Sequence, residues 1–318
     1  MLSKPAEISI KINKIFEKIM PLFTISGVTL GFLFSGFLMN FRPLVPFIFG
    51  IITLSGALRL RARDIGIAAT APIPILLFFL GSRIIMPFTV LMISRLIFRN
   101  NPEMVTGFVL LYSVPTAVTS FIWVTIFKGD LALVLALILL DTILAPVLVP
   151  GTLRIFLGAS VTLNMTGMVI TLILMVVLPT ILGITLNETS RGKIPAMLNP
   201  WLPTISKLLI ILVISINTST ASSRVSFDNP DLWIAVAVCI FFAASGFSIG
   251  KLFGIAGKLD KERQTALMMT NGIKNNNVAM TLGVSFFPVA VALPALLALI
   301  FQHSLAAIMG RVFTGNKE

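Results

Sequence analysis

The sequence predicts an all-α membrane protein in which ten helices cross a lipid bilayer. Three observations support this fold class. Of the 318 residues, 57% are hydrophobic and only 11% are charged, whereas soluble domains carry about 25% charged residues. Ten apolar segments are long enough to form spanning helices, which need about 20 residues each. Most Lys and Arg residues lie in the short connections between these segments.

The ten predicted helices follow one another with short polar connections. They cover approximately residues 21–39, 44–60, 68–98, 104–127, 130–150, 161–187, 199–220, 232–253, 263–286 and 288–310. Proline removes a backbone hydrogen bond, so we expect Pro72, Pro74 and Pro87 to kink the third helix. Residues 1–20 alternate charged and apolar positions, which predicts a cytoplasmic or interfacial segment rather than a signal peptide.

The positive charges predict the orientation. Sixteen of the 24 Lys and Arg residues fall at the N-terminus, in the even-numbered connections or at the C-terminus, and five fall in the odd-numbered connections. This bias places both termini in the cytoplasm, with the protein in the cell (inner) membrane. The net charge of +12 therefore reflects membrane topology, and nucleic acid is not an expected partner.

The two halves of the chain resemble each other in pattern. Residues 21–150 and 161–311 each hold five predicted helices, joined by a connection at 151–160 and followed by a cytoplasmic tail at 312–318. An odd number of spans per half reverses the orientation of the second half. The fourth helix of each half is interrupted. This pattern predicts inverted repeats with a binding site at the two broken helices.

The fourth helix contains Pro115 within "LLYSVPTAVTSFIWVTIFKGD". Proline breaks the helical hydrogen-bond ladder and leaves carbonyl groups without donors. The hydroxyl groups of Ser113, Thr116, Thr119 and Ser120 are close enough to bind these carbonyls. The alternative to a functional break is an ordinary proline kink that hydroxyl groups stabilise.

The ninth helix contains the polar stretch "TNGIKNNNVAM", residues 270–280. A lysine at the centre of a membrane helix costs roughly 2.5–3.5 kcal/mol on insertion scales, so Lys274 is unfavourable next to lipid. An ordinary loop is a poor alternative, because only 263–269 precede it. We therefore expect a protein-lined polar cavity at a helix broken near Gly272. The amides that line it are Asn271, Asn275, Asn276 and Asn277.

Two further charges lie within predicted helices. Asp141, in "LALILLDTILAPV", has no polar neighbour except Thr142, so we expect it to pair with Lys274 or Arg83, or to titrate. Arg83 has three alternatives: it neutralises Asp141, binds an anionic substrate, or extends to the membrane interface.

The single Cys239 and the single His303 limit other chemistry. One cysteine cannot form an intrachain disulfide, and one histidine excludes a site with several histidine ligands. No cofactor and no resident metal are expected. The sequence also lacks the Ser/His/Asp and HExxH patterns of hydrolases, so an enzyme is not expected.

Several motifs resemble those of the bile acid:sodium symporter family. "GIKNNNVAMTLG" is similar to the ninth-helix motif of the family, Glu-x-Gly-x-Gln-Asn followed by small and apolar residues. "VPTAVTSFIWVTIFKGDLALVLALILLDTILAPVLVP" resembles the fourth and fifth helices, including Pro115, the turn at 128–130 and the ending at 144–146. "GSRIIMP", residues 81–87, resembles the third helix, and the resemblance covers essentially the whole chain.

This resemblance implies a fold and a function. It implies ten helices in two inverted five-helix repeats, a core domain with crossed, discontinuous helices four and nine, and a panel domain. It also implies alternating-access transport of organic anions, from bile acids to smaller carboxylates. The implied substrate-binding residues are Thr116, Thr119, Ser120, Asn271, Asn275, Asn276 and His303. For His303 the alternative is a histidine that serves only helix packing.

The sequence departs from the family at the positions that usually surround sodium. The family glutamate two residues before the motif glycine is here Thr270, and the motif glutamine is Lys274. Other polar family positions align with Ser82, Phe121, Val134 and Ile138. We therefore predict that the sodium sites are lost and that the charge of Lys274 replaces a bound cation.

The coupling ion follows from the same residues. Crossed-helix sodium/proton antiporters also keep an acid in helix five and a lysine near the crossing. By this analogy Lys274 and Asp141, with Thr270 and Arg83 beside them, form an ion-coupling group that makes a proton the candidate coupling ion. The alternative is a static ion pair that holds the core together.

Three functions remain open from the sequence. The first is a sodium-independent secondary transporter of small organic anions. Its transport is coupled to protons if Lys274 and Asp141 exchange a proton, and is not if they form a static ion pair. The second is a proton-coupled cation antiporter of similar fold, for which Asp141 is the only support. The third is a membrane receptor that transports nothing.

Overall fold

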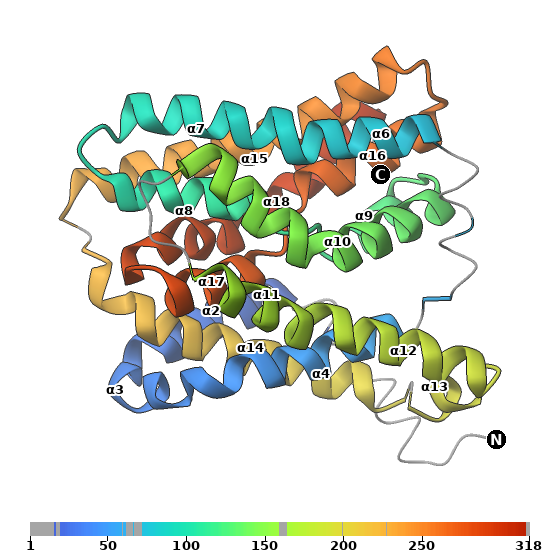
Figure 1. Cartoon of the computed structure of the whole chain (residues 1–318), viewed down its shortest axis with the longest axis horizontal. Coiled ribbons are helices and arrows are strands. Elements are labelled where there is room, and N and C mark those ends of the chain that lie inside the picture. Colours follow the sequence, from blue (N-terminus) through green and yellow to red (C-terminus); the bar gives the residue numbers. More distant parts are fainter. Residues whose placement is uncertain are drawn as a thin grey trace. The chain divides into compact units, whose positions relative to one another are not determined.

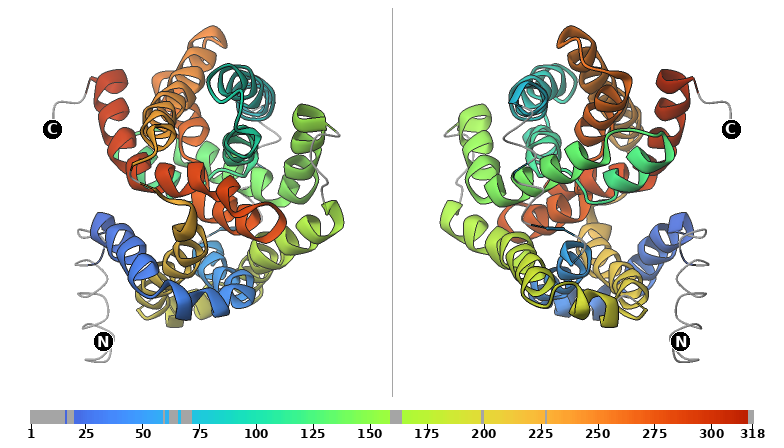
Figure 2. Two further views of the ribbon diagram at one scale, coloured as in Figure 1. Left: turned by 90° about the vertical axis from the view of Figure 1, so that its left-hand side faces the viewer. Right: turned by 90° about the vertical axis from the view of Figure 1, so that its right-hand side faces the viewer.

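A computed structural model describes residues 16, 20–58, 60–61, 66, 72–158, 164–198, 200–226 and 228–315 of the chain. Within these residues the regular secondary structure is helical and no β-strand occurs (Figure 1 and Figure 2). This confirms the predicted all-α class. The expected interfacial segment at 1–20 and residues 316–318 of the expected tail lie outside the described residues, apart from residues 16 and 20.

The chain divides into two compact units. Unit 1 comprises residues 1–62 and 170–223, and unit 2 comprises residues 63–169 and 224–318. The helices of unit 1 are α2 (Met20–Leu33), α3 (Ser35–Leu38), η1 (Met39–Leu44), α4 (Val45–Ala57), η4 (Ile173–Val177), α12 (Leu178–Thr189), α13 (Lys193–Leu198) and α14 (Leu202–Ala221). Two short elements, α11 (Met165–Leu172) and η5 (Ser222–Arg224), cross the boundary between the units.

Small residues allow close helix packing in unit 1. Helix α14 packs along α2 and α4, and α4 also packs on α12. A Cβ atom on Gly31 of α2 would lie 2.6 Å from the carbonyl oxygen of Ser215 on α14. The two helices could not approach so closely with a larger residue at this position, as is typical of membrane helix pairs.

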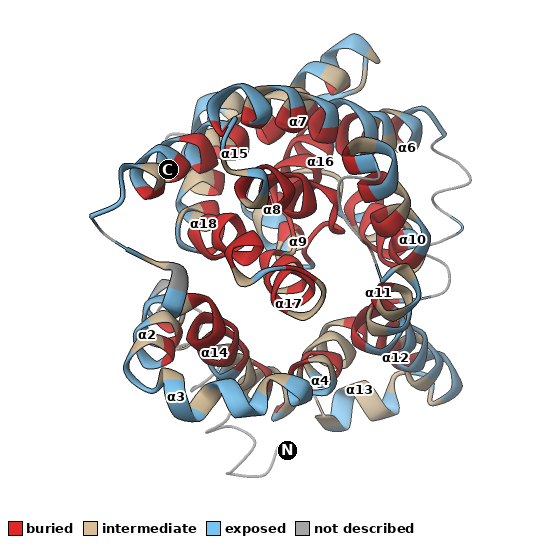
Figure 3. Cartoon of the chain, turned by 60° about the vertical axis from the view of Figure 1, so that its left-hand side comes forward, coloured by how far each residue is buried: buried red, intermediate tan, exposed pale blue. Residues whose placement is uncertain are grey.

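Unit 2 contains the helices that were expected to be interrupted. Its helices are α6 (Pro72–Phe79), η2 (Leu80–Ile85), α7 (Met86–Ile97), α8 (Pro102–Ser113), α9 (Ser120–Ile126), α10 (Leu131–Leu157), α15 (Pro230–Ala256), α16 (Lys261–Gly272), α17 (Asn276–Phe286), η6 (Val289–Ala292) and α18 (Leu293–Thr314). Figure 3 shows that buried residues dominate α8, α16 and α17. All residues of 104–117 and 265–274 are buried.

Seven helical stretches of the described chain are long and apolar enough to cross a membrane. They are Ser35–Ala57, Pro72–Ile97, Leu131–Leu157, Met165–Thr189, Leu202–Ala221, Pro230–Ala256 and Val289–Thr314. The other three expected segments correspond to the shorter helix α2 and to the helix pairs α8/α9 and α16/α17. On α10, Val147 and Ile155 are 73% and 77% exposed, as expected for side chains that face acyl chains.

Two details differ from the sequence-based expectations. The irregularity in the third segment is the π-helical turn η2, and of the three prolines only Pro87 lies beside it. A second π-helical turn, η4, precedes Pro179 in the same way. A proline offers no N–H to the carbonyl four residues earlier, and a π-helical turn is one way to adjust the ladder. Helix α10 continues to Leu157, so most of the expected connection at 151–160 is helical.

Candidate functional site

The first interruption lies between α8 and α9 of unit 2. Helix α8 ends at Ser113, and Val114 has an extended backbone with φ −71° and ψ 159°. The residue before a proline is pushed out of helical geometry, and Pro115 cannot donate to the preceding turn. Helix α9 begins again at Ser120. The break predicted at Pro115 is therefore present.

The second interruption lies between α16 and α17. Helix α16 ends at Gly272, and Ile273 is extended with φ −102° and ψ 104°. The Oδ1 atom of Asn275 accepts a hydrogen bond of 3.3 Å from the Val278 N–H and caps α17. A Cβ atom on Gly272 would lie 2.3 Å from the ring of Phe247, so only glycine fits here without movement. The break predicted near Gly272 is also present.

The two interruptions cross each other as a short antiparallel bridge between Thr116 and Lys274. The Asn275 N–H donates to the Pro115 carbonyl at 2.9 Å, and the Ala117 N–H donates to the Ile273 carbonyl at 3.2 Å. These bonds give each broken helix partners for backbone groups that would otherwise be unpaired in a membrane.

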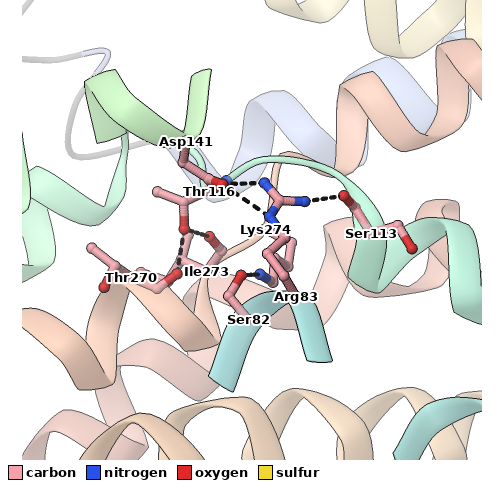
Figure 4. Close-up of polar contacts among 8 residues, drawn as sticks. All are labelled: Ser82, Arg83, Ser113, Thr116, Asp141, Thr270, Ile273 and Lys274. Carbon is pink, nitrogen blue, oxygen red and sulfur yellow. Dashed lines mark hydrogen bonds and ion pairs between the residues drawn. The ribbon is translucent and has the colours of Figure 1, made fainter. Parts of the chain in front are cut away.

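The hydroxyl group of Thr116 fastens the crossing to the end of α16 (Figure 4). Its Oγ1 atom donates toward the carbonyl of Thr270 and lies 3.2 Å from the carbonyl of Ile273. Thr116 is 2% exposed, so these bonds are shielded from solvent. A hydroxyl group was expected to bind the carbonyls that Pro115 frees in its own helix, whereas Thr116 binds carbonyls at the end of the other broken helix.

Asp141 of α10 and Arg83 of η2 form a buried ion pair beside the crossing. The Nε and Nη2 atoms of Arg83 both donate to Oδ1 of Asp141, the former at 3.0 Å. Arg83 Nη1 donates to the carbonyl of Ser113, at the end of α8. The Thr116 N–H donates to Oδ2 of Asp141 at 2.7 Å. The partner of Asp141 is thus Arg83, and the alternative that Arg83 extends to the membrane interface is wrong.

Lys274 lies in the same cluster with different partners. Its side chain is 1% exposed, and its Nζ atom donates to the Ser82 hydroxyl at 2.5 Å. Its backbone N–H donates to Oε1 of Gln302 on α18 at 3.0 Å. Within the described residues, Lys274 makes no ion pair with Asp141 or with another carboxylate. The predicted Lys274–Asp141 pair is therefore not formed as a direct ion pair, because Arg83 and Thr116 occupy the carboxylate.

The charges at the crossing do not cancel. Arg83 and Asp141 neutralise each other, so Lys274 adds a net positive charge whenever it is protonated. A buried charge is costly unless it is paired. The chain therefore supplies a positively charged position at the crossing that an anion can neutralise.

The asparagines around Lys274 leave polar atoms without hydrogen-bond partners. Asn271 donates through Nδ2 to the Leu267 carbonyl at 3.0 Å, but its Oδ1 atom is buried and unpaired within the described residues. Both polar side-chain atoms of Asn276, and Oδ1 of Asn277, are also buried without a partner there. Buried polar groups in proteins are almost always satisfied, so these atoms are available to a ligand or to water.

The remaining predicted site residues differ in burial and in their hydrogen-bond partners. Ser120 is buried and donates to the Ala117 carbonyl at 2.8 Å, and Thr119 is half-buried before α9. His303 is half-buried, and its Nδ1 atom accepts a hydrogen bond of 3.2 Å from Nε1 of Trp123 on α9. The roles of Trp123 and Gln302 were missed. A lone polar atom in an apolar helix was the only signal for either residue.

Acids, histidine and cysteine are the side chains that most often hold a metal ion in proteins. In the described part of the chain, no three of these side chains lie close enough together to hold an ion. The positions that align with the sodium-site positions of the family either carry apolar side chains or already make hydrogen bonds within the protein. Val134 and Ile138 belong to a buried apolar cluster against which Phe121 packs, and the Thr270 hydroxyl donates to the Ala266 carbonyl at 2.8 Å.

The chain is similar in sequence to known membrane proteins. A family model described as the Sodium Bile acid symporter family matches residues 45–226. The uncharacterized protein YbaS of Bacillus subtilis (strain 168) is 37% identical over 92% of this chain and 95% of its own length. The uncharacterized sodium-dependent transporter YocS of the same organism is 23% identical over 96% of this chain and 94% of its own length. The probable sodium/metabolite cotransporter BASS3, chloroplastic, of Oryza sativa subsp. japonica is 24% identical over 82% of this chain and 62% of its own length.

Proposed function

Because the chain belongs to the sodium bile acid symporter family, we propose that it is a secondary active transporter that moves small organic anions across the cell membrane by alternating access. The family and the transporter names of relatives support a membrane transporter and not an enzyme. The finer parts of the proposal are the substrate class, carboxylates, and the independence from sodium. Both parts depend on the residues at the crossing of α8/α9 with α16/α17.

The proposed architecture has ten spans in two inverted repeats, residues 21–150 and 161–311, with both termini in the cytoplasm. The division into two units supports it. Each repeat contributes its first two segments to unit 1 and its last three to unit 2. In this proposal unit 1 is the panel domain and unit 2 is the core domain that holds the crossing.

The single observation that carries sodium independence is the position of Lys274. Its ammonium group is buried beside the crossing and binds Ser82, which aligns with a polar position of the family. A sodium ion at this location would compete with the Nζ atom of Lys274 for the hydroxyl oxygen of Ser82. Sodium also needs several oxygen ligands, and the apolar packing around Val134 and Ile138 supplies none. The charge of Lys274 thus takes the place of a bound cation.

The charge balance supports an anionic substrate. Arg83 and Asp141 cancel, so Lys274 leaves the site positive. The side-chain amide of Asn276, whose polar atoms are buried without a partner in the described residues, adds a donor near the same crossing. We propose that Asn271, Asn275, Asn276, Thr119 and His303 contact the substrate. Thr116 and Ser120 use their hydroxyl groups inside the crossing, so in this proposal they position the substrate contacts.

A cation antiporter is less well supported by the same contacts. Such a transporter needs a carboxylate that is free to bind its cation. Both oxygen atoms of Asp141 accept hydrogen bonds from Arg83 or Thr116. To reach Asp141, a cation would have to break both hydrogen bonds that the guanidinium group of Arg83 donates to it.

Transport measurements test the proposal. Purified protein in liposomes is given a panel of radiolabelled carboxylates in sodium chloride or in choline chloride, with protein-free liposomes as the control. We expect uptake of at least one carboxylate at the same rate in both salts. Uptake that requires sodium would overturn sodium independence, and the absence of uptake for every carboxylate would overturn the substrate class.

A further inference from the structure

We propose that Lys274 alone carries the coupling proton, and that one proton moves with each monocarboxylate, so that transport transfers no net charge. This inference rests on the proposed function and deepens it. It assigns different roles to two residues of the cluster: Lys274 exchanges a proton during each cycle, whereas Asp141 stays ionised and positions the crossing. The two residues have different partners, and these partners decide which of them can exchange a proton.

The contacts of Asp141 favour a permanently charged carboxylate. Its two oxygen atoms accept from Arg83 Nε at 3.0 Å, from Arg83 Nη2, and from the Thr116 N–H at 2.7 Å. All three partners are N–H donors, and a protonated carboxyl would turn one acceptor oxygen into a donor facing them. The guanidinium group of Arg83 cannot lose its proton in a protein. A proton on Asp141 would therefore have to displace one of these three donors.

The contacts of Lys274 suit a group that exists in two protonation states. The partner of its Nζ atom is the hydroxyl group of Ser82. A hydroxyl accepts a hydrogen bond from an ammonium group and equally donates one to a neutral amine. Ser82 is fully buried, so it stays beside Nζ in either state. Burial without a carboxylate partner disfavours the charged form of an amine.

Other titratable groups near the crossing do not take part. The elements packed around it carry Arg95 on α7, Glu103 and Tyr112 on α8, Arg154 on α10, Asp231, Cys239 and Lys251 on α15, Lys261, Glu262 and Arg263 on α16, and His303 and Arg311 on α18. Within the described residues no hydrogen bond or ion pair joins any of them to Lys274. His303 is engaged with Trp123 instead. Arg83 and Asp141 are the two other charges at the crossing, and they neutralise each other.

The cycle follows from the cost of a buried charge. When a carboxylate is bound, Lys274 is an ammonium ion and the pair is neutral. When the carboxylate leaves, the ammonium group would be unpaired in a membrane-embedded core, which is unfavourable. Nζ therefore gives its proton to water on the side of release and keeps its electron pair as a neutral amine. The empty and the loaded core then carry the same charge, so a membrane potential does no work on either.

Separate pH and potential gradients test the inference in the wild-type protein. Liposomes take up radiolabelled lactate or pantoate under an inward proton gradient, or under a potassium potential of either sign set with valinomycin. We expect the proton gradient to drive accumulation, and the potential of either sign to leave the initial rate unchanged. A dye inside the liposomes should report one proton entering with each monocarboxylate. Protein-free liposomes correct for diffusion of the neutral acid.

The Lys274→Arg variant separates binding from proton release. A guanidinium group still pairs with a carboxylate but cannot become neutral. We expect any exchange of internal for external substrate that the variant retains to occur without net accumulation, so that the ratio of accumulation to exchange falls well below that of the wild type. Retained exchange also shows that the variant is folded. The matched control is Lys251→Arg on α15, which should retain both activities.

The outcomes distinguish this inference from the proposed function. Sodium-independent uptake that follows the membrane potential, or net accumulation by Lys274→Arg at the wild-type level, would overturn proton exchange at Lys274 and leave carboxylate transport intact. A requirement for sodium, or failure to transport any probe, would overturn the proposed function itself.

Discussion

Arg83 binds Asp141 through two of its nitrogen atoms, 58 residues apart in sequence, and the same guanidinium group binds the carbonyl at the end of α8. Arg83 is 6% exposed and Asp141 is 0% exposed. The pair therefore connects η2, α8 and α10 through charged hydrogen bonds that are shielded from water. Such a pair holds the crossing in place only while both partners are present.

The first prediction concerns removal of one or both partners of this pair. Arg83→Met or Asp141→Leu alone leaves an unpaired buried charge, and each is expected to destabilise the protein by about 3–5 kcal/mol. The double variant removes both charges and should be clearly more stable than either single variant. Thermal unfolding in detergent measures the stability of the wild type, the two single variants and the double variant. If the two single effects simply add in the double variant, the two residues do not stabilise each other.

The second prediction concerns the unpaired charge of Lys274. Lys274→Met keeps most of the side-chain volume and removes a buried ammonium group that has a single neutral partner, Ser82. We expect this variant to unfold at a higher temperature than the wild type, because the cost of burying the amine, either charged or stripped of its proton, disappears. It should also lose uptake driven by a proton gradient.

A control separates this effect from a general effect of the substitution. Lys251→Met changes a half-buried lysine on α15 and should leave both the unfolding temperature and proton-driven uptake close to the wild type. A strong loss of stability in Lys274→Met would show that the lysine is a structural group.

The third prediction concerns the hydroxyl group that fastens the two broken helices. Thr116→Val preserves the shape of the side chain but removes the donor to the carbonyls of Thr270 and Ile273. The loss of a buried hydrogen bond should destabilise the protein by about 1–3 kcal/mol. Thr116→Ser retains the donor and should cost less. Chemical or thermal unfolding of the two variants compares them directly, and equal losses would show that the methyl group matters and the hydroxyl does not.

The sequence alone predicted the two breaks, because each depends on local chemistry. Pro115 cannot continue a helix, and Gly272 precedes a run of amides whose desolvation cost excludes a lipid-facing helix. Both signals lie within a few residues of the break. The all-α class followed in the same way from composition and segment length.

The partners of the charges could not be chosen from the sequence. Asp141 had two candidate partners, Arg83 and Lys274, at sequence separations far beyond one helical turn. The choice depends on how η2 and α10 face the crossing, and Arg83 lies within the π-helical turn η2. The contact between Trp123 and His303 likewise depends on tertiary packing, since 180 residues separate the two side chains.

The fourth prediction concerns Gly272, where the second break requires the smallest residue. A Cβ atom there would lie 2.3–2.5 Å from three ring atoms of Phe247, so Gly272→Ala forces the ring or the backbone to move. Overpacking of this kind costs about 1–3 kcal/mol, and the crossing should also lose its geometry. We expect lower thermal stability together with reduced carboxylate uptake.

A matched glycine and a compensating substitution complete this test. Gly151 lies within α10, where an added Cβ atom meets nothing within 4 Å, so Gly151→Ala should be neutral or slightly stabilising. Phe247→Leu in the Gly272→Ala background removes part of the clash and should recover some of the lost uptake. If Gly272→Ala behaves like Gly151→Ala, the close approach of α15 to the break does not constrain the crossing.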